Sequence, residues 1–432
     1  MLTPTQRRQQ AIAITKNPKI SGSARVVAEK IVGIMDEQFV RMAGYLGQPS
    51  PAGDYQQAEI SGPGILALIK PVGDQCNLRC RYCFNKPFQA SEVMPEAILE
   101  KIVKEVLETS PVGNFTLHGG EPTLAGLGFF QKLIDLQQRY ARPGQEVKNS
   151  VVTNATLLNE DWAKFLSIHK FGVGISIDGP PEVHDKNRVY PDGCGSMERV
   201  LEGIRTLQAH GITPGVLSVV GCPPATSPQN LYDYFISIGI RQWRSKICRT
   251  KENDGGYGQY IEGLFETWCE RGGNANIIFI EEVLRGLSGY RTRTCWMSGA
   301  CQRLIGFEPD GVVSPCCEMS LDPQYHFGNI ASSSLRDLLE GSAAKTFWAE
   351  KKKGDDNHCH GCEWGFLCKG GCTYQRIQYG GEVSGRDYLC DVYKDSFSRL
   401  AERIDSFLNQ DFIQERDVFE ESPVKCLLAG NL

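Results

Sequence analysis

Through the middle of the chain, hydrophobic and polar positions alternate between strand-like runs and segments with helical spacing. Six short runs are apolar or alternate between apolar and polar residues, as strands do; they span residues 65–70, 114–118, 147–153, 171–177, 212–220 and 240–247. The intervening segments repeat their apolar residues at helical spacing. The clearest is PEAILEKIVKEVLE (95–108), and the others begin near Leu127, Asn159, Ser196, Pro228 and Tyr257. Six strand–helix units in a row predict an α/β fold, with a parallel sheet that curls into a partial (β/α)6 barrel.

The segments on either side of this pattern differ from it. Apolar residues recur near helical spacing from Ala24 to Leu46, and a linker rich in proline and glycine follows. This helix either packs on the main domain or docks a partner. Cysteines crowd together after Arg291, and a helix is expected from Asp391 to Asn409. The predicted parts are a helical extension and linker (1–62), the barrel (63–290), a cysteine-rich domain (291–395) and a C-terminal helix with a tail (396–432).

Composition narrows the classes of function. The chain has 432 residues, of which 41% are hydrophobic and 22% charged, as in ordinary globular proteins. A net charge of −5 gives no electrostatic basis for binding nucleic acid or an anionic membrane. We find no apolar signal core and no run of 18 apolar residues, and therefore expect a cytoplasmic protein without a membrane partner. In a large cytoplasmic chain, 17 cysteines suggest metal rather than disulfides.

Cys76, Cys80 and Cys83 follow the first predicted strand in the run CNLRCRYCF. The spacing C-x3-C-x2-C supplies three thiolates, whereas a cubane of four irons has four corners. One iron therefore stays open and can bind a small chelating molecule. The alternative is a zinc knuckle or a set of buried thiols, but zinc sites usually close with four ligands in paired short spacings.

Polar residues also end the later strands. His118, Gly119, Gly120, Glu121 and Pro122 follow the second strand. Glycines there let the backbone approach a ligand closely, and Glu121 offers a carboxylate to an ammonium group. Because parallel strands end at one edge of the sheet, we expect these residues to face the three-cysteine loop. Further candidates at the same edge are Asn154, Ser176 and Asp178; Asp178 is either a ligand contact or a loop cap.

The later cysteines form a second, longer pattern. Cys301 is followed by Gly311 and Cys316, and then come Cys359-x2-Cys362-x5-Cys368-x3-Cys372 and Cys390. Cys295 precedes them. Eight thiolates suit two fully ligated 4Fe–4S clusters, while the C-x2-C-x5-C-x3-C block taken alone is also compatible with zinc.

These patterns together resemble the radical S-adenosylmethionine (SAM) enzymes with a cysteine-rich SPASM domain. The resemblance implies three 4Fe–4S clusters and SAM as cofactors. It places SAM on the open iron of the first cluster, against the GGEP turn and Ser176. It also assigns the remaining ligands: Cys295, Cys301, Cys316 and Cys372 to one auxiliary cluster, and Cys359, Cys362, Cys368 and Cys390 to the other.

Over residues 65 to 400 the chain is similar to one group in particular, the anaerobic sulfatase-maturating enzymes. The runs GGEPTLAGLGFF (119–130), GISIDGPPEVHDKNR (174–188) and LCKGGC (367–372) carry the similarity. Those enzymes oxidise a serine or cysteine of a sulfatase to formylglycine. Three positions depart from their pattern: Asn85 replaces a tyrosine, His118 a glutamine, and Cys317 the aspartate that serves as general base.

The loss of that aspartate changes the expected reaction. Oxidation of an alcohol or thiol to an aldehyde releases a proton, which needs a base. A thiol serves as a base only when its pKa is lowered. Cys317 is thus either a space-filling thiol or spare ligand, or a group that exchanges a proton or hydrogen atom. His118 is either an acid/base group or a satisfied polar residue.

We therefore expect an enzyme that modifies a ribosomally made peptide by crosslinking or excision, and keep sulfatase maturation as the alternative. A non-catalytic iron–sulfur electron carrier and a zinc-stabilised binding protein are alternatives of other classes. The resemblance implies a peptide or protein substrate and a reducing donor such as flavodoxin or ferredoxin. The first 62 residues show no peptide-recognition domain, so a separate leader-binding protein is expected to serve that role.

Overall fold

The computed structural model describes residues 1–46, 64–83, 92–221, 225–248 and 256–420. The linker expected after Gly47, the departure at Asn85, and the cysteines at 222 and 426 lie outside these ranges.

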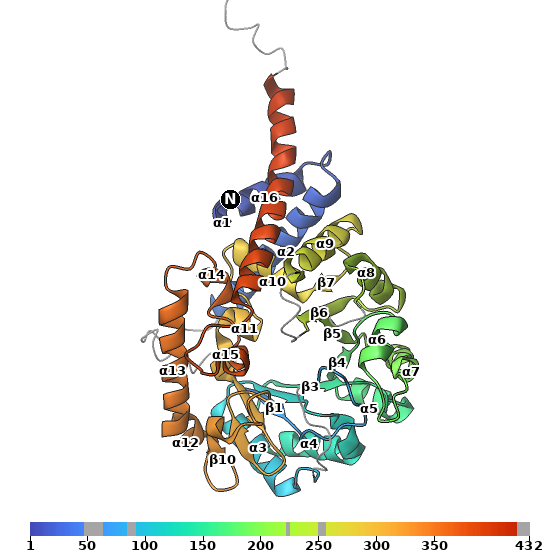
Figure 1. The fold of residues 1–432 in the computed structure, drawn as a ribbon, viewed down its shortest axis with the longest axis vertical. Helices are drawn as coiled ribbons and strands as arrows, with labels where there is room; N and C mark the ends of the chain where they lie inside the picture. Colours follow the sequence, from blue (N-terminus) through green and yellow to red (C-terminus); the bar gives the residue numbers. More distant parts are fainter. Residues whose placement is uncertain (47–63, 84–91, 222–224, 249–255, 421–432) are drawn as a thin grey trace, which may run out of the picture.

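The six predicted strands are confirmed, and they form the centre of one parallel sheet in chain order. Their bounds are β1 Leu66–Ile69, β2 Gly113–Leu117, β3 Val147–Thr153, β4 Gly172–Ser176, β5 Gly215–Val220 and β6 Gln242–Ile247. Each strand pairs in parallel with the next. The strands follow a curve with the helices outside it (Figure 1). All six carboxyl ends therefore meet at one edge.

The sheet continues beyond these six strands at both sides. β7 (Asn276–Ile277) extends it past β6, and β8 (Leu304–Phe307) pairs in parallel with β1. A hairpin adds β9 (Val312–Ser314), and β10 (Gly328–Asn329) pairs with β9. The cysteine-rich region is thus joined to the barrel through a shared sheet. This pairing brings the hairpin close to the carboxyl end of β1.

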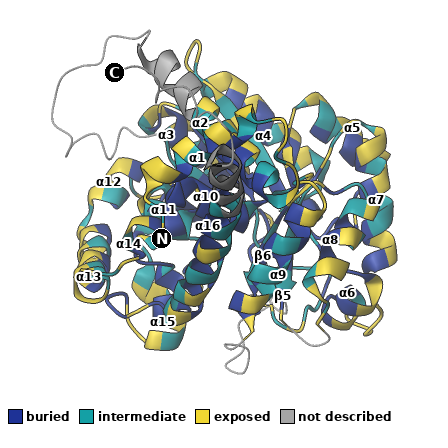
Figure 2. Ribbon diagram, turned by 90° about the horizontal axis from the view of Figure 1, so that it is seen from above, coloured by how far each residue is buried: buried dark blue, intermediate teal, exposed yellow. Residues whose placement is uncertain are grey.

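Six helices that follow the strands begin within one residue of the predicted positions, and two further helices, at residues 181–187 and 278–287, were not predicted. They are α3 Glu96–Thr109, α4 Gly126–Tyr140, α5 Glu160–Ile168, α6 Pro181–Asn187, α7 Met197–Ala209, α8 Pro228–Ser237, α9 Tyr257–Glu270 and α10 Ile278–Leu287. The Asn159 side chain caps α5 by accepting from the Trp162 N–H at 3.1 Å. In α3 the apolar positions face inward, and Leu99, Ile102 and Val106 are fully buried. Buried residues fill the interior between helices and sheet (Figure 2).

Two N-terminal helices, α1 (Pro4–Lys16) and α2 (Gly22–Leu46), pack on α16 (Cys390–Glu420). Figure 1 shows them beside the middle of this long helix, whose upper end projects past them. Ile31 and Ile34 of α2 are buried, so this helix packs on the main domain, which was one of the two alternatives. The mostly polar α1 was not predicted. A buried ion pair holds it in place, with Arg7 Nε 2.7 Å from Asp405 Oδ1.

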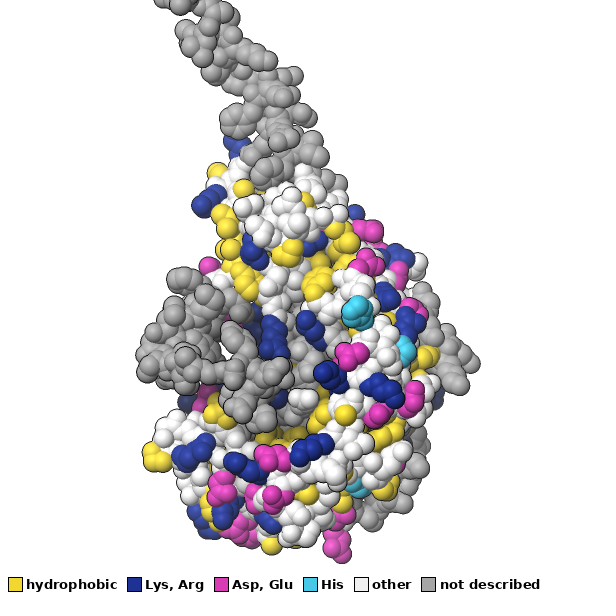
Figure 3. Space-filling view, turned by 90° about the vertical axis from the view of Figure 1, so that its left-hand side faces the viewer, with side chains coloured by type: hydrophobic (Ala, Val, Ile, Leu, Met, Phe, Trp, Pro, Cys, Tyr) yellow, Lys and Arg dark blue, Asp and Glu magenta, His cyan; other side chains and the backbone are white. Residues whose placement is uncertain are grey.

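Short elements build the rest of the cysteine-rich region. They are α11 Cys295–Ser298, α12 Leu335–Glu340, α13 Ser342–Cys359, α14 Gly365–Cys368 and α15 Thr373–Gly380, with 3-10 turns at Ala300–Arg303 and Pro323–Tyr325. Another 3-10 turn, Pro122–Ala125, follows β2 in the barrel. The boundary expected between residues 395 and 396 falls inside α16, because that helix already begins at Cys390. None of the described helices has the length and apolar character that a membrane crossing needs. Acidic and basic side chains are intermingled on the face drawn in Figure 3.

Candidate active site and cluster sites

A cavity of about 180 Å³ lies at the carboxyl ends of the barrel strands. It joins the three-cysteine loop, the turn after β2, the ends of β3 to β6, and the turn after β9. Its described lining includes Cys76, Cys80, Cys83, His118, Gly119, Gly120, Asn154, Ser176, Arg188, Lys246 and Glu318. The edge of the sheet predicted from the sequence is therefore where the candidate residues gather.

All three cysteines of the loop line this cavity. A chain of side-chain hydrogen bonds fixes the loop: Asn154 Nδ2 donates to Asn77 Oδ1 at 2.8 Å, and Asn77 Nδ2 donates to Thr156 at 2.8 Å. Burial raises the pKa of Cys76 to about 12 and that of Cys80 to about 11. Buried thiols of this kind lose their protons when iron ligates them, so the donor set fits an iron–sulfur cluster.

Gly119 and Gly120 bring the turn after β2 against the cysteine loop. The Gly120 N–H donates to Gly73 O at 2.9 Å, and the Glu121 N–H donates to Gln75 O at 2.8 Å. A Cβ on Gly120 would lie 2.0 Å from Gln75 O, and Gly119 has a φ of +115°. Both positions therefore require glycine, and both line the cavity as predicted.

Glu121 and Pro122 are buried beneath the turn and are not part of the described lining. Oε1 of Glu121 accepts from the Thr123 N–H at 3.1 Å and from the Thr153 hydroxyl at 2.7 Å. Its Oε2 accepts from the Asn154 N–H at 2.7 Å. Burial raises the pKa of Glu121, although these hydrogen bonds act in the opposite direction. In this structure Glu121 ties the turn to the end of β3, because these donors draw its carboxylate away from the cavity.

Asn154 and Ser176 line the cavity, whereas Asp178 does not. Asp178 is buried and accepts hydrogen bonds from the Tyr82 hydroxyl, from Arg188 Nη2 at 3.0 Å and from the Val219 N–H at 3.0 Å. Of the two roles expected for Asp178, ligand contact and loop cap, this geometry favours the loop cap.

Arg188 is a cavity residue that the sequence analysis did not single out. Its guanidinium carbon lies 5.4 Å from the centroid of the Tyr82 ring. Burial alone would lower the pKa of Arg188, but the neighbouring Asp178 carboxylate raises it. Arg188 therefore keeps its charge inside the cavity and can hold a carboxylate.

The wall formed by the end of β2, the end of β6 and the turn after β9 carries His118, Lys246 and Glu318. Lys246 Nζ lies 3.5 Å from Glu318 Oε1. Burial, followed by the charge of Lys246, lowers the pKa of His118 to about 4, so its ring is neutral at pH 7. Its buried Nδ1 has no hydrogen-bond partner within the described part of the chain.

Cys317 is buried and does not belong to the described lining of this cavity. Its thiol instead contacts the neighbouring Cys316. A side-chain hydrogen bond between the two, and then burial, raise the pKa of Cys316 well above its usual range. Cys317 thus lies where a space-filling thiol or a spare ligand would lie. The carboxylate that reaches the cavity from this turn belongs to Glu318, which the sequence analysis missed.

The later cysteines gather in the two predicted groups. Cys359, Cys362, Cys368 and Cys390 line one pocket, together with Trp364 and Phe397. In the other group, burial raises the pKa of Cys295 and Cys372; a thiolate at Cys301 would raise both pKa values further, and one at Cys316 that of Cys295, so these side chains lie near one another. Burial raises the pKa of Cys295 and of Cys368 to about 12. Among the described residues, no three metal-binding side chains converge closely enough for a single ion. Each group offers four half-buried thiols, the number of protein ligands that a fully ligated 4Fe–4S cluster takes.

Cys248 was not among the predicted ligands, and it is in a disulfide bond. All other cysteines in the described ranges are free thiols.

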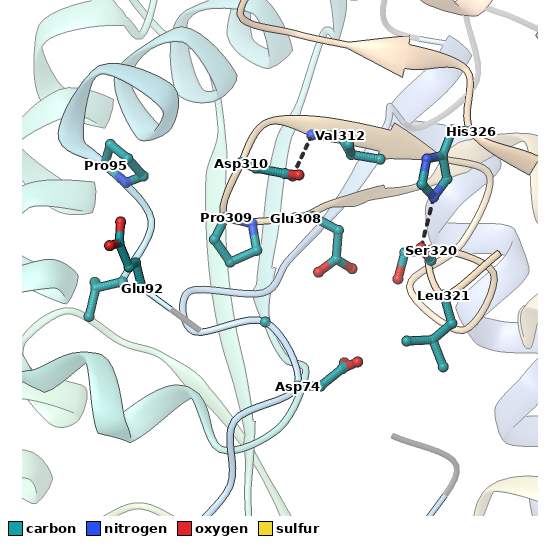
Figure 4. Close-up of a pocket in the computed structure, with 12 residues that line it drawn as sticks. Asp74, Glu92, Pro95, Glu308, Pro309, Asp310, Val312, Ser320, Leu321 and His326 are labelled. Carbon is teal, nitrogen blue, oxygen red and sulfur yellow. Dashed lines mark hydrogen bonds between the residues drawn. The ribbon is translucent and has the colours of Figure 1, made fainter. Parts of the chain in front are cut away.

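A second and larger cavity, of about 550 Å³, contains none of these cysteines. Asp74, Glu92, Glu308 and Asp310 surround it together with His326 (Figure 4). Buried Lys70 neutralises part of this acidic wall, because its Nζ lies 2.9 Å from Asp74 and 2.8 Å from Glu308.

Comparisons with known proteins agree with this geometry. Residues 71–227 match the model of the radical SAM superfamily, and residues 295–363 match that of SPASM, an iron–sulfur cluster-binding domain. A cysteine-type anaerobic sulfatase-maturating enzyme of Clostridium perfringens is 32% identical over 368 residues, which is 80% of this chain and 99% of that protein. A serine-type enzyme of Bacteroides thetaiotaomicron is 29% identical, covering 82% and 93% of the two chains.

Solved structures of anaerobic sulfatase-maturating enzymes are also similar to this chain. The enzyme anSMEcpe with bound AdoMet (SAM) has a TM-score of 0.72 and 30% identity, covering 80% of this chain and 99% of that one. Its complex with AdoMet and the Cp18Cys peptide has a TM-score of 0.72 and 32% identity, covering 79% and 98% of the chains. Streptococcus suis SuiB bound to its precursor peptide SuiA has a TM-score of 0.54, covering 78% and 77%, but only 16% identity, and so shares the fold alone.

Proposed function

We propose, on the premise that this chain belongs to the radical SAM and SPASM family of the anaerobic sulfatase-maturating enzymes, that it oxidises a serine or cysteine side chain of a peptide or protein segment to formylglycine. The observation that carries the proposal is the single cavity in which the three-cysteine loop, the Gly119-Gly120 turn and a carboxylate of the SPASM region meet.

The cofactors of these two domains are 4Fe–4S clusters and SAM. When bound, they supply a carbon-centred radical that removes a hydrogen atom, and an acceptor for one electron. We assign the SAM-binding cluster to Cys76, Cys80 and Cys83. We assign the backbone of Gly119 and Gly120 to the SAM amino group, because these residues bring main-chain groups to the cavity wall.

Other cavity residues complete the site for SAM. Ser176 offers a hydroxyl to the polar groups of the cofactor, and Asn154 an amide. Arg188 offers a permanent positive charge to its carboxylate, and Asp178 and Tyr82 hold this guanidinium in place. These residues set the position of the cofactor and exclude water, which is the contribution that a protein makes to radical chemistry.

Oxidation of the side chain to the aldehyde level removes a hydrogen atom from carbon, a proton from the hydroxyl or thiol, and one electron. A thioaldehyde formed from cysteine then takes up water and releases hydrogen sulfide. We assign the uptake of the proton to the cavity wall that carries the Glu318 carboxylate and the neutral ring of His118. Cys317 lies away from the cavity and receives no role in the reaction.

The comparisons favour sulfatase maturation over the peptide-crosslinking reaction expected from the sequence. The relatives that span this chain at about 30% identity are named for sulfatase maturation, while the likeness to SuiB is one of fold. The physical objection to sulfatase maturation was a missing carboxylate at residue 317. Glu318 places a carboxylate in the cavity from the next residue along. Peptide crosslinking is the second candidate, favoured by the departure at Cys317; a separate leader-binding protein belongs to that candidate.

A peptide assay separates the two candidates. The reconstituted enzyme, kept free of oxygen, is incubated with SAM, a reducing donor such as flavodoxin, and the Cp18Cys peptide or its serine counterpart. We expect 5′-deoxyadenosine together with a peptide product that reacts with an aldehyde reagent. For the serine peptide, the product is lighter by two hydrogens. A product that has lost two hydrogens but does not react with the reagent is a crosslink, and would replace this proposal with the second candidate.

A further inference from the structure

An ion pair between the barrel and the SPASM region lies in the cavity wall. Lys246 is the last-but-one residue of β6, and Glu318 lies in the turn after β9. The two side chains meet inside the cavity, with Lys246 Nζ 3.5 Å from Glu318 Oε1. They come from two different parts of the chain, the barrel and the cysteine-rich region.

The turn that carries Glu318 is held firmly. The Met319 N–H donates to Cys316 O at 3.0 Å, and the Ser320 hydroxyl donates to Cys317 O at 2.9 Å. A Cβ on Gly306 of β8 would lie 3.0 Å from the Cys317 nitrogen, so strand and turn are in close contact. These contacts turn Cys317 toward Cys316 and Glu318 toward the cavity.

Apolar side chains that line the cavity near Lys246 and Glu318 limit the polar partners that a ligand can find there. Leu78, Val152, Leu217, Val219 and Ile247 supply apolar surface to the same cavity. A polar group placed among apolar walls fixes the orientation of a ligand, because few other partners compete for it. The Glu318 side chain is only 12% exposed, and the ammonium of Lys246 keeps its carboxylate oriented.

We propose that Glu318, positioned by Lys246, accepts a hydrogen bond from the hydroxyl or thiol of the substrate side chain and so selects serine or cysteine as the target. This inference rests on the proposed function and adds the residue that recognises the target. Glu318 holds the polar atom while the adjacent carbon faces the cofactor side of the cavity. Lys246 acts through Glu318 and is a positioning residue.

Binding of matched peptides tests the inference without any turnover. The holoenzyme with SAM, but without a reductant, is titrated with fluorescently labelled Cp18Cys peptide, with its serine counterpart, and with the same peptide carrying alanine at the target. The wild-type protein should bind the serine and cysteine peptides about tenfold to a hundredfold more tightly than the alanine peptide, as expected for a hydrogen bond to a charged group. Glu318→Ala should bind all three alike.

Two further variants separate recognition from folding. Glu318→Gln keeps an acceptor oxygen but loses the charge, and should retain a preference for the serine peptide of about half the wild-type free energy. Lys246→Met should weaken the preference without abolishing it. The matched control is the surface pair of Lys132 and Glu96, whose atoms lie 2.9 Å apart on the outer helices α4 and α3. Glu96→Ala should leave the preference unchanged, and all variants should keep the iron content of the wild type.

The possible outcomes distinguish a failure of this inference from a failure of the proposed function. A Glu318→Ala variant that still prefers the serine peptide by the wild-type factor would overturn the inference, as would a wild-type protein that does not discriminate or does not bind. If the wild-type enzyme forms the aldehyde but shows no such preference, the proposed function stands and this inference falls. If the preference is present and depends on Glu318 but no aldehyde forms, recognition stands and the proposed reaction falls.

Discussion

Replacing Gly120 with alanine should dismantle the first cluster site while leaving the rest of the protein folded. The added Cβ would lie 2.0 Å from the oxygen of Gln75, 2.5 Å from its carbonyl carbon and 2.6 Å from that of Asp74. All three are backbone atoms of the loop that leads into Cys76, so no side-chain rotation can relieve the clash. Ordinary contact begins near 3.4 Å, and the loop must therefore move by about 1.4 Å.

That movement has an energetic cost that can be bounded. Forcing extra atoms into a packed site costs about 1–3 kcal/mol. The displacement also breaks two backbone hydrogen bonds, from Gly120 to Gly73 at 2.9 Å and from Glu121 to Gln75 at 2.8 Å, each contributing roughly 1 kcal/mol. The total of roughly 3–5 kcal/mol is smaller than the stability of many domains. The loop is therefore expected to shift or loosen while the barrel stays folded.

The assay compares iron content and SAM binding after anaerobic reconstitution. Gly120→Ala should lose about four irons per chain, those of one 4Fe–4S cluster, and bind SAM about a hundredfold more weakly. The matched control is Gly128→Ala in α4, where an added Cβ meets nothing within 4 Å. This control should keep its iron and become slightly more stable, by about 0.5–1 kcal/mol. Full iron content and unchanged SAM affinity in Gly120→Ala would refute the argument that the two loops must touch.

Three further predictions concern buried groups. Burial, followed by the charge of Arg188, lowers the pKa of His184 to about 3, so below pH 6.5 the unfolded chain binds a proton that the folded chain does not bind. The free energy of unfolding should therefore fall by about 3 kcal/mol between pH 7.5 and 4.5. In urea unfolding, His184→Gln should lose about 3 kcal/mol less than the wild type over this range, and an equal loss in both proteins would contradict the assignment. Lys70→Met removes the charge that pairs with Asp74 and Glu308, and should lower the free energy of unfolding by roughly 3–5 kcal/mol. The control Lys132→Met removes a surface charge and should lower it by less than about 1 kcal/mol. Equal melting temperatures for the two variants would contradict this prediction. Cys317→Ala should keep the full iron content and 5′-deoxyadenosine formation, because its thiol lies outside the cavity, and a loss of four irons would identify it as a ligand.

The sequence predicts the barrel well because its signal is local: strand and helix periods identify all six central strands. The division of the later cysteines into two groups was implied by the family resemblance, and the structure brings Cys359, Cys362, Cys368 and Cys390 together at one pocket. The polar helix α1 was missed, because only Ala11 and Ile14 supply buried apolar contacts and a distant partner, Asp405, stabilises it.

The direction in which a side chain points could not be predicted in the same way. Glu121 was expected to face SAM, and Asp178 was expected either to do so or to cap a loop, but donors contributed by neighbouring strand ends draw both carboxylates inward. In the turn after β9, the cavity receives Glu318 rather than Cys317. That choice depends on how the turn packs against β8, a strand that joins the sheet beside β1 only in the folded protein.

The most direct test of the central claim is SAM cleavage by a variant in which Cys76, Cys80 and Cys83 are all replaced with alanine. The account predicts that this protein forms no 5′-deoxyadenosine, yet retains about eight irons per chain in its two auxiliary clusters. If the variant still cleaves SAM, the three-cysteine loop is not the catalytic cluster site, and the assignment of the cavity is wrong.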